Sequence, residues 1–221
     1  GETVGGRAEI PLRRCLSRAV RMLATARTID IYGVENSVTP ASDLLTKLTY
    51  LGLNCRMHTD TYLQQISAAH LGVADVAVAV PIPGAPLILL ALKQARKAGA
   101  GTIAITSPKE PLLGKYADVC LSTGGRALSI YGSAIFSRIP DLAVVDLLYM
   151  GIIQSDYERF SRSLDKSGAV IAAGDTETNN KSFSLPCKFL TQKGGFFERF
   201  FTFLLQKLKF EVLVCSAIKL V

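Results

Sequence analysis

The stretch ADVAVAV, residues 74–80, decides the fold class of this chain. Apart from its single aspartate, the stretch is entirely apolar and alternates valine with alanine. A short, nearly continuous apolar run of this kind is typical of a strand that is buried on both faces at the centre of a parallel sheet. We therefore take residues 74–80 as the central strand and extend the prediction outward from it.

Strands and helices alternate on both sides of this run. Short apolar segments predict further strands over 28–34, 53–58, 101–107 and 117–122. Apolar residues at helical spacing predict helices over 10–26, 39–50, 59–72, 87–98 and 133–154, followed by a polar helix over 155–167. Pro40 suits the first turn of its helix, and Thr59 or Asp60 suits a helix cap. The alternation predicts an α/β fold: a three-layer, doubly wound sheet of about five parallel strands with helices on both faces.

Composition restricts the classes of function. The 221 residues carry 25 basic and 18 acidic side chains, and this net charge of +7 is spread along the chain, which favours anionic partners only weakly. Five widely spaced cysteines and two isolated histidines argue against a disulfide framework, a metal centre or a Ser-His-Asp triad. We expect no metal, no cofactor and a reducing, cytoplasmic location. The chain begins at Gly1 without a signal peptide, which predicts a fragment of a longer protein.

Four predicted loops follow strand ends, at 33–37, 81–86, 106–108 and 122–125. Right-handed crossovers would place all four along one rim of the sheet, where ligands of doubly wound folds bind. Three of the loops are rich in Gly, Ser or Thr. Such residues beside helix N-termini suit a phosphate group, because backbone N–H groups and the helix dipole attract the anion and hydroxyls add donors.

The stretch IYGVENSVTPASDLLTKL, with the later runs ALKQARKAGAGTIAITSP, KYADVCLS and SAIFSRIPDLAVVDLLYMGI, resembles the SIS domain of RpiR-like transcriptional regulators. The resemblance covers residues 10–170 and leaves a leader at 1–9 and an atypical tail at 171–221. It implies a non-enzymatic sensor that binds a phosphosugar, forms a homodimer or tetramer, and acts on DNA through a helix-turn-helix that is absent here. The end of the tail is strongly apolar and could form a membrane-surface or oligomerisation helix, although a packing or non-native segment is favoured. Lys207, Lys209 and Glu211 interrupt it, so no transmembrane span and no membrane partner are expected.

The family's first ligand loop reads Gly-x-Gly-x-Ser, which Gly33 and Ser37 match, whereas Glu35 replaces the second glycine. The second loop reads Ser-x-Ser-Gly-x-Ser/Thr, of which only Gly84 remains among prolines. Because proline has neither a hydroxyl nor an N–H, and because a carboxylate repels phosphate, weak phosphosugar binding is expected. The residues that the resemblance places at the ligand are Glu35, Asn36, Ser37, Gly84, Thr106 and Ser107.

A local shift of reading frame is one hypothesis for the proline loop, and the tail could share this origin. If residues 80–89 are encoded by GTT CCT ATT CCG GGN GCN CCC CTG ATA TTN, reading from the last base of the Val80 codon gives Ser-Tyr-Ser-Gly, one open position, then Ser or Thr and Pro-Asp-Ile. The shifted reading restores the family motif. Sequencing the source DNA across these codons tests the hypothesis.

The alternative function is a sugar-phosphate isomerase, since SIS domains also occur in such enzymes. An isomerase needs a general base near the sugar carbonyl, and Glu35 and His58 are the local candidates. Pairing of chains is expected for a second reason besides the resemblance. The apolar residues of the 10–26 and 133–154 helices exceed what one sheet face should cover.

Overall fold

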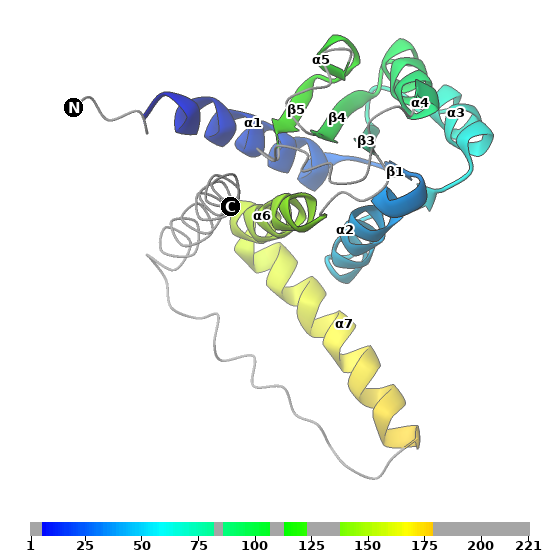
Figure 1. Cartoon of the computed structure of the whole chain (residues 1–221). Coiled ribbons are helices and arrows are strands. Elements are labelled where there is room, and N and C mark those ends of the chain that lie inside the picture. Colours follow the sequence, from blue (N-terminus) through cyan, green and yellow to red (C-terminus); the bar gives the residue numbers. More distant parts are fainter. Residues whose placement is uncertain (1–5, 82–85, 107–112, 123–137, 179–221) are drawn as a thin grey trace, which may run out of the picture.

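The computed structural model describes residues 6–81, 86–106, 113–122 and 138–178 (Figure 1). The strands are β1 (Ile29–Gly33), β2 (Cys55–His58), β3 (Val76–Val80), β4 (Gly101–Thr106) and β5 (Val119–Ser122). The helices are α1 (Gly6–Thr25), α2 (Val38–Tyr50), α3 (Thr61–Ala69), α4 (Pro86–Lys97), α5 (Leu113–Tyr116), α6 (Ile139–Ser155) and α7 (Tyr157–Thr178), with a 3-10 turn, η1, at Glu35–Ser37.

The five strands form one parallel sheet in the order β2-β1-β3-β4-β5. The run at 74–80 supplies the central strand, β3, and all five of its residues are buried. The α/β prediction of about five parallel strands is therefore confirmed. The predicted cap of α3 is also present, because the Asp60 carboxylate accepts hydrogen bonds from the N–H groups of Tyr62 and Leu63. Short α5 was not predicted.

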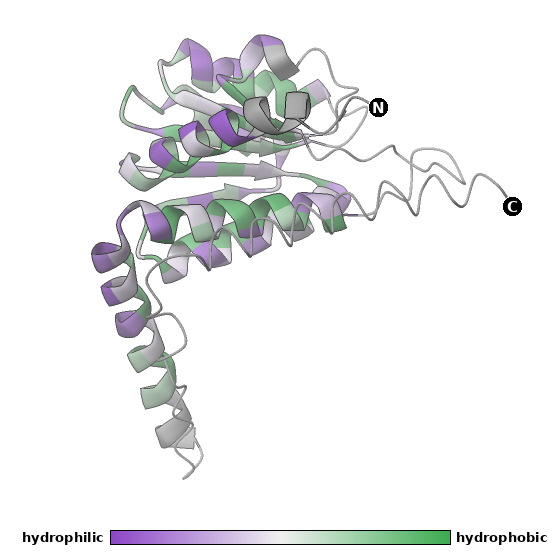
Figure 2. Ribbon diagram, turned by 90° about the vertical axis from the view of Figure 1, so that its left-hand side faces the viewer, coloured by the Kyte–Doolittle hydropathy of each residue, from purple (hydrophilic) through white to green (hydrophobic). Residues whose placement is uncertain are grey.

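Helices cover both faces of the sheet, giving three layers (Figure 2). Successive strand side chains point to opposite faces, and the two faces differ in residue size. The face under α1, α2 and α6 presents isoleucine, valine and leucine, including Ile31, Val78 and Ile105. The face under α3, α4 and α5 presents smaller alanines at 77, 79 and 104 together with Tyr32. Each face of the sheet thus has its own cluster of buried apolar residues, covered by helices of the same chain.

Helices α1 and α6 pack against each other on the first face. A side chain at Gly151 of α6 would place its Cβ 2.7 Å from a methyl group of Val20 on α1, so the two helices meet where one has no side chain. From Leu16 to Ala24, the apolar residues of α1 are buried in this contact and against the sheet, except for half-buried Met22. In the described residues these two helices bury apolar side chains against each other. The expectation that they also pair with a second chain stays a prediction.

Helix α7 turns away from the body of the domain (Figures 1 and 2). Its first turns are anchored, because Phe160 is fully buried and the Arg159 guanidinium donates to the Ala24 carbonyl at the end of α1. The helix then continues to Thr178, beyond the boundary predicted at residue 171. Among the described residues, no helix combines the length and apolar character that crossing a membrane requires.

Candidate functional site

The strand order reverses between β1 and β3, and this reversal marks the candidate site. From β1 the chain crosses outward to β2, returns to β3 and then continues in the other direction. Ligands of open parallel sheets bind in the crevice beyond the carboxyl ends of the strands at such a point. Gly33 and Val80 are register neighbours at the ends of these two strands. The turn at 33–37 and Pro81, which follow these two strands, therefore border one rim.

The first loop contains a left-handed backbone residue. Glu35 has φ +50°, a conformation that favours glycine because any other side chain crowds its own backbone. Two residues earlier, a Cβ on Gly33 would lie 2.8 Å from the Cβ of Ala41 on α2. The backbone geometry thus calls for glycine at both positions, but the sequence supplies it only at Gly33. Glu35 itself is exposed on the turn.

Ser37 closes the same loop through its hydroxyl group. The Oγ atom accepts a hydrogen bond from the Val34 N–H at 2.8 Å and donates to the Val34 carbonyl at 2.7 Å. Ser37 is fully buried and directly precedes α2. Its hydroxyl proton is therefore used inside the loop, where it holds the turn against the N-terminus of α2.

Asn36 connects this loop to a distant helix. Its Oδ1 accepts a hydrogen bond of 2.5 Å from Nη2 of Arg138, the N-cap residue of α6. Nη1 of Arg138 donates to Asp141 at 2.9 Å. Within the described part of the chain, the buried Nε of Arg138 has no hydrogen-bond partner. The guanidinium, which is ion-paired with Asp141, thus fixes the first loop to the start of α6.

Sequence reasoning missed Arg138, although a signal was present. A cation at a helix N-terminus is unfavourable with respect to the helix dipole, so it needs an anionic partner nearby. The order Arg138-Ile139-Pro140-Asp141 places such a carboxylate in the first turn. The link to Asn36, 102 residues away in the sequence, was beyond the reach of local patterns.

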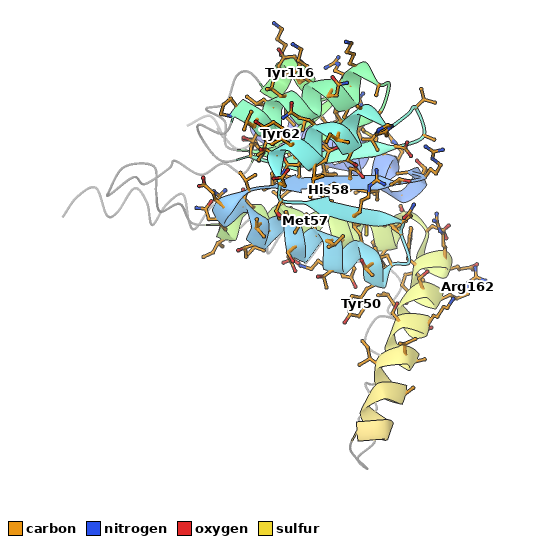
Figure 3. The ribbon with its side chains drawn as sticks, turned by 90° about the vertical axis from the view of Figure 1, so that its right-hand side faces the viewer. Tyr50, Met57, His58, Tyr62, Tyr116 and Arg162 are labelled. Atoms are coloured by element: carbon orange, nitrogen blue, oxygen red, sulfur yellow. The ribbon has the colours of Figure 1, made fainter. Side chains whose placement is uncertain are left out.

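The edge of the rim beside β2 holds a buried amide. Gln64 of α3 is fully buried, and its Nε2 donates to the carbonyls of Gly33 at 3.2 Å and His58 at 2.8 Å. Gln64 therefore joins α3 to the ends of both β1 and β2. Gln64 Oε1 and His58 Nε2 are buried and have no hydrogen-bond partner among the described residues. Figure 3 shows His58 at the end of the edge strand.

Asp30 anchors the sheet below this rim. This fully buried carboxylate accepts from Arg56 Nε at 2.5 Å, from Ser67 Oγ at 2.5 Å and from the Tyr32 hydroxyl at 3.2 Å. Burial, reinforced by the nearby carboxylate, raises the pKa of Tyr32 far above its ordinary value. The phenol consequently stays protonated and remains a donor to Asp30.

Known proteins resemble this chain over the same region. It is 34% identical over 158 residues to an HTH-type transcriptional regulator, TTE0211, of Caldanaerobacter subterraneus, and the match covers 71% of this chain and 56% of that protein. It is 27% identical over 157 residues to the HTH-type transcriptional regulator RpiR of Escherichia coli, covering 71% and 53%. The chain thus spans about half the length of these relatives. No protein-family model matches the chain.

Two solved structures share the fold. The sugar isomerase domain of an RpiR transcription factor from Sphaerobacter thermophilus aligns with a TM-score of 0.63 at 23% identity, over 71% of this chain and 86% of that one. NanR of Vibrio vulnificus, in complex with ManNAc-6P, aligns with a TM-score of 0.67 at 24% identity, over 72% and 60%. The chain carries a SIS domain of the RpiR-like type.

The SIS domain brings part of the predicted ligand set together. Glu35, Asn36 and Ser37 share the turn after β1, and Thr106 ends β4 two strands away on the same rim. Thr106 is buried, with Ser122 of β5 as its register neighbour. Gly84 and Ser107 lie outside the described residues, so their predicted role stays a prediction.

The second loop of the SIS domain differs from the family motif at both of its described ends. Pro81 is buried directly after β3, and Pro86 is the first residue of α4. Proline suits the first helical position, where an N–H is not needed by the helix. The same N–H is one that a ligand at the helix N-terminus would use. These prolines therefore suit the fold but remove donors from the rim.

Proposed function

We propose that this chain is the effector-binding part of an RpiR-like transcriptional regulator and that it takes a phosphosugar between the loops after β1 and β3. One observation carries the proposal: the tight turn at 33–37 meets the N-terminus of α2 beside the point where the strand order reverses. The bound sugar phosphate of NanR, a protein of the same fold, supports this class of ligand.

Two groups on the rim favour an anion, whereas the exposed Glu35 carboxylate opposes it. Arg138 brings a guanidinium against the first loop, while the helix dipole of α2 adds a positive partial charge beside Ser37. We propose that DNA binding belongs to a helix-turn-helix in the part of these HTH-type relatives that this chain does not match. We propose a cytoplasmic regulator, as the bacterial regulators among its relatives suggest.

The isomerase alternative has less support. His58 Nε2 is buried, so this nitrogen is not accessible to a substrate carbon. Glu35 is exposed on a turn and would need a substrate to lie against it from the solvent side. A general base must come within hydrogen-bonding reach of the proton that it removes. Two of the matched relatives are named as transcriptional regulators, which favours a sensor, whereas others at 39–40% identity over 138 residues are named bifunctional protein glk.

Calorimetry with hexose, pentose and amino-sugar phosphates tests the proposal. We expect weak binding by the natural chain and stronger binding by a Pro81→Ser, Pro83→Ser, Pro86→Thr variant, which regains three hydroxyls and three N–H groups. The substitutions end there because Ile88, which the shifted reading frame would make an aspartate, is a fully buried residue of α4. The same triple variant with Arg138→Gln added should bind the sugar phosphates no more tightly than the natural chain. Micromolar binding by the natural chain would show that the proline loop is tolerated. Turnover of any of these sugars would favour the isomerase.

A further inference from the structure

The outer side of helix α1 carries a row of arginines. Arg14, Arg18 and Arg21 are exposed and follow one another at intervals of four and three residues. Residues at these intervals are neighbours on one face of a helix. The opposite side of α1 includes Leu16 and Leu23, which are buried in the core beneath it. The three arginines therefore point away from the domain, and we call this surface the α1 arginine face.

The positive charge of this face is not balanced by acidic side chains of the described residues. Arg14, Arg18 and Arg21 form no ion pair with a described residue, whereas Arg27, just beyond the helix, is paired with Asp75. The sequence has no aspartate or glutamate between residues 10 and 29. Like charges three and four residues apart repel each other along a helix, so an anionic partner would relieve this repulsion.

The composition of α1 favours a phosphate backbone over a lipid surface as that partner. A helix that lies on a membrane needs exposed apolar side chains next to its basic ones. Among the described side chains of α1, no large apolar one is exposed, and the exposed residues beside the arginines are Ser17 and Thr25. A guanidinium can donate two parallel hydrogen bonds to one phosphate, which makes arginine well suited to nucleic acids.

The spacing of the arginines also suits a nucleic-acid backbone. From Arg14 to Arg21 the helix rises about 10 Å, at about 1.5 Å per residue. Successive phosphates of one DNA strand lie about 3.4 Å apart along the duplex axis, so the row spans about three phosphate steps. We propose that the α1 arginine face contacts the phosphate backbone of duplex DNA. The choice of DNA rests on the proposed function, because the relatives are HTH-type transcriptional regulators.

Such a contact differs in kind from the reading of an operator. Phosphate contacts fix the position of a protein on the duplex but carry no direct information about base sequence. The α1 arginine face would thus hold this domain against DNA, while recognition of the sequence belongs to the helix-turn-helix proposed above. Figure 1 shows α1 lying along one side of the domain next to α6, so its outer side is open to a large partner.

Titration of a labelled duplex, followed by fluorescence anisotropy from about 20 to about 200 mM salt, tests the proposal. We expect the natural chain to bind at low salt and to bind less tightly as salt rises, because each phosphate contact releases counterions. The Arg14→Gln, Arg18→Gln, Arg21→Gln variant should bind about tenfold more weakly or worse at the lowest salt. Its slope of log affinity against log salt should become shallower by about 2.7 per chain, or about 0.9 for each lost contact.

Two matched variants separate the position of the charge from its amount. The Lys93→Gln, Lys97→Gln, Lys115→Gln variant removes the same charge from exposed positions of α4 and α5, and it should keep the natural slope within about one unit. The Arg14→Lys, Arg18→Lys, Arg21→Lys variant keeps the charge and should keep most of the slope. Glutamine and lysine are both good helix formers, so α1 should persist in all three variants, as circular dichroism can verify.

Three results would overturn the proposal. The first is a natural chain that does not bind the duplex at the lowest salt. The second is an equal loss of affinity in the lysine-to-glutamine and arginine-to-glutamine variants, which would reflect net charge alone. The third is tighter binding to vesicles of anionic phospholipid than to the duplex, which would assign the face to a membrane. Duplexes of unrelated sequence should bind equally well, since their backbones are alike, and a strong preference among them would also contradict a phosphate contact.

Sugar-phosphate calorimetry separates a failure of this inference from a failure of the proposed function. The arginine-to-glutamine variant should bind sugar phosphates as the natural chain does. If duplex binding fails while a sugar phosphate binds, only the role of the α1 arginine face is wrong. If the duplex binds through the arginines but no sugar phosphate binds, even after the proline substitutions, the proposed effector site is wrong instead.

Discussion

Replacing Glu35 by glycine should improve both the stability of this domain and its affinity for a phosphosugar. The backbone at Glu35 has φ +50°, which costs a residue with a side chain about 1–2 kcal/mol. Glycine removes that cost but gains roughly 0.5–1 kcal/mol of extra freedom in the unfolded chain. We therefore expect the free energy of unfolding, measured with urea, to rise by about 0.5–1 kcal/mol. The melting temperature should rise by about 2–4 °C for each kcal/mol.

The effect of Glu35 on affinity comes from its charge. A carboxylate about 6 Å from a phosphate in a largely aqueous environment costs about 0.7 kcal/mol for each unit of phosphate charge. A dianionic phosphate doubles that figure, so removing the carboxylate should tighten binding about tenfold at low salt. Calorimetry with a hexose phosphate, on the chain carrying serine at 81 and 83 and threonine at 86, measures this gain.

Glu35→Gln separates the two effects, because glutamine removes the charge but retains the unfavourable φ. It should show the gain in affinity without the gain in stability. The backbone argument is refuted if Gln and Gly stabilise the domain equally. The charge argument is refuted if both variants bind the sugar phosphate less tightly than the Glu35 chain, since the carboxylate would then be a ligand to the sugar hydroxyls.

Three further predictions concern other polar contacts. Arg138→Gln should lower stability by about 1–3 kcal/mol in urea unfolding, because it removes charge-assisted bonds that join the loop to α6, whereas Arg138→Lys should lose less. Ser37→Ala should cost about 1 kcal/mol and weaken phosphosugar binding in calorimetry, because the loop loses both hydroxyl bonds. The hydrogen bonds from Arg27 hold the pKa of Asp75 below 3.8. That stabilisation is present above pH 3.8 and is lost as pH falls through the lowered pKa, so in thermal melts Asp75→Asn should be less stable at pH 7 and approach the natural chain in acid.

The sequence predicts the strands of this domain better than its connections. The run at 74–80 is recognisable because a strand buried on both faces needs apolar residues throughout. Strand β2, at the edge of the sheet, is less distinct: Arg56 is exposed, and only four residues of the predicted 53–58 pair with β1. The short helix α5 has too few residues to show a helical period, so no pattern could have predicted it.

In the candidate site too, some features could be predicted from the sequence and others could not. The rim could be predicted because the carboxyl ends of parallel strands share one edge. The link between Asn36 and Arg138 could not, because it depends on how α6 packs after four described helices (α2 to α5) and four strands (β2 to β5) have intervened. The Glu35 conformation was predictable only in part: the resemblance expects glycine there, but only the observed φ shows that the backbone keeps the glycine geometry.

The loop geometry of this domain therefore depends on different groups from those that would bind a ligand. Position 33 requires glycine because a Cβ there would collide with Ala41, and the Ser37 hydroxyl donates its proton to the Val34 carbonyl. The fold would therefore need both residues even if the domain bound no ligand. Pro86 likewise begins α4 without loss to the helix. Ligand donors can be lost from such a rim without altering the sheet or its helices. For this reason a chain with a proline-rich second loop keeps the fold of its relatives, and restoring the donors should change its affinity much more than its structure.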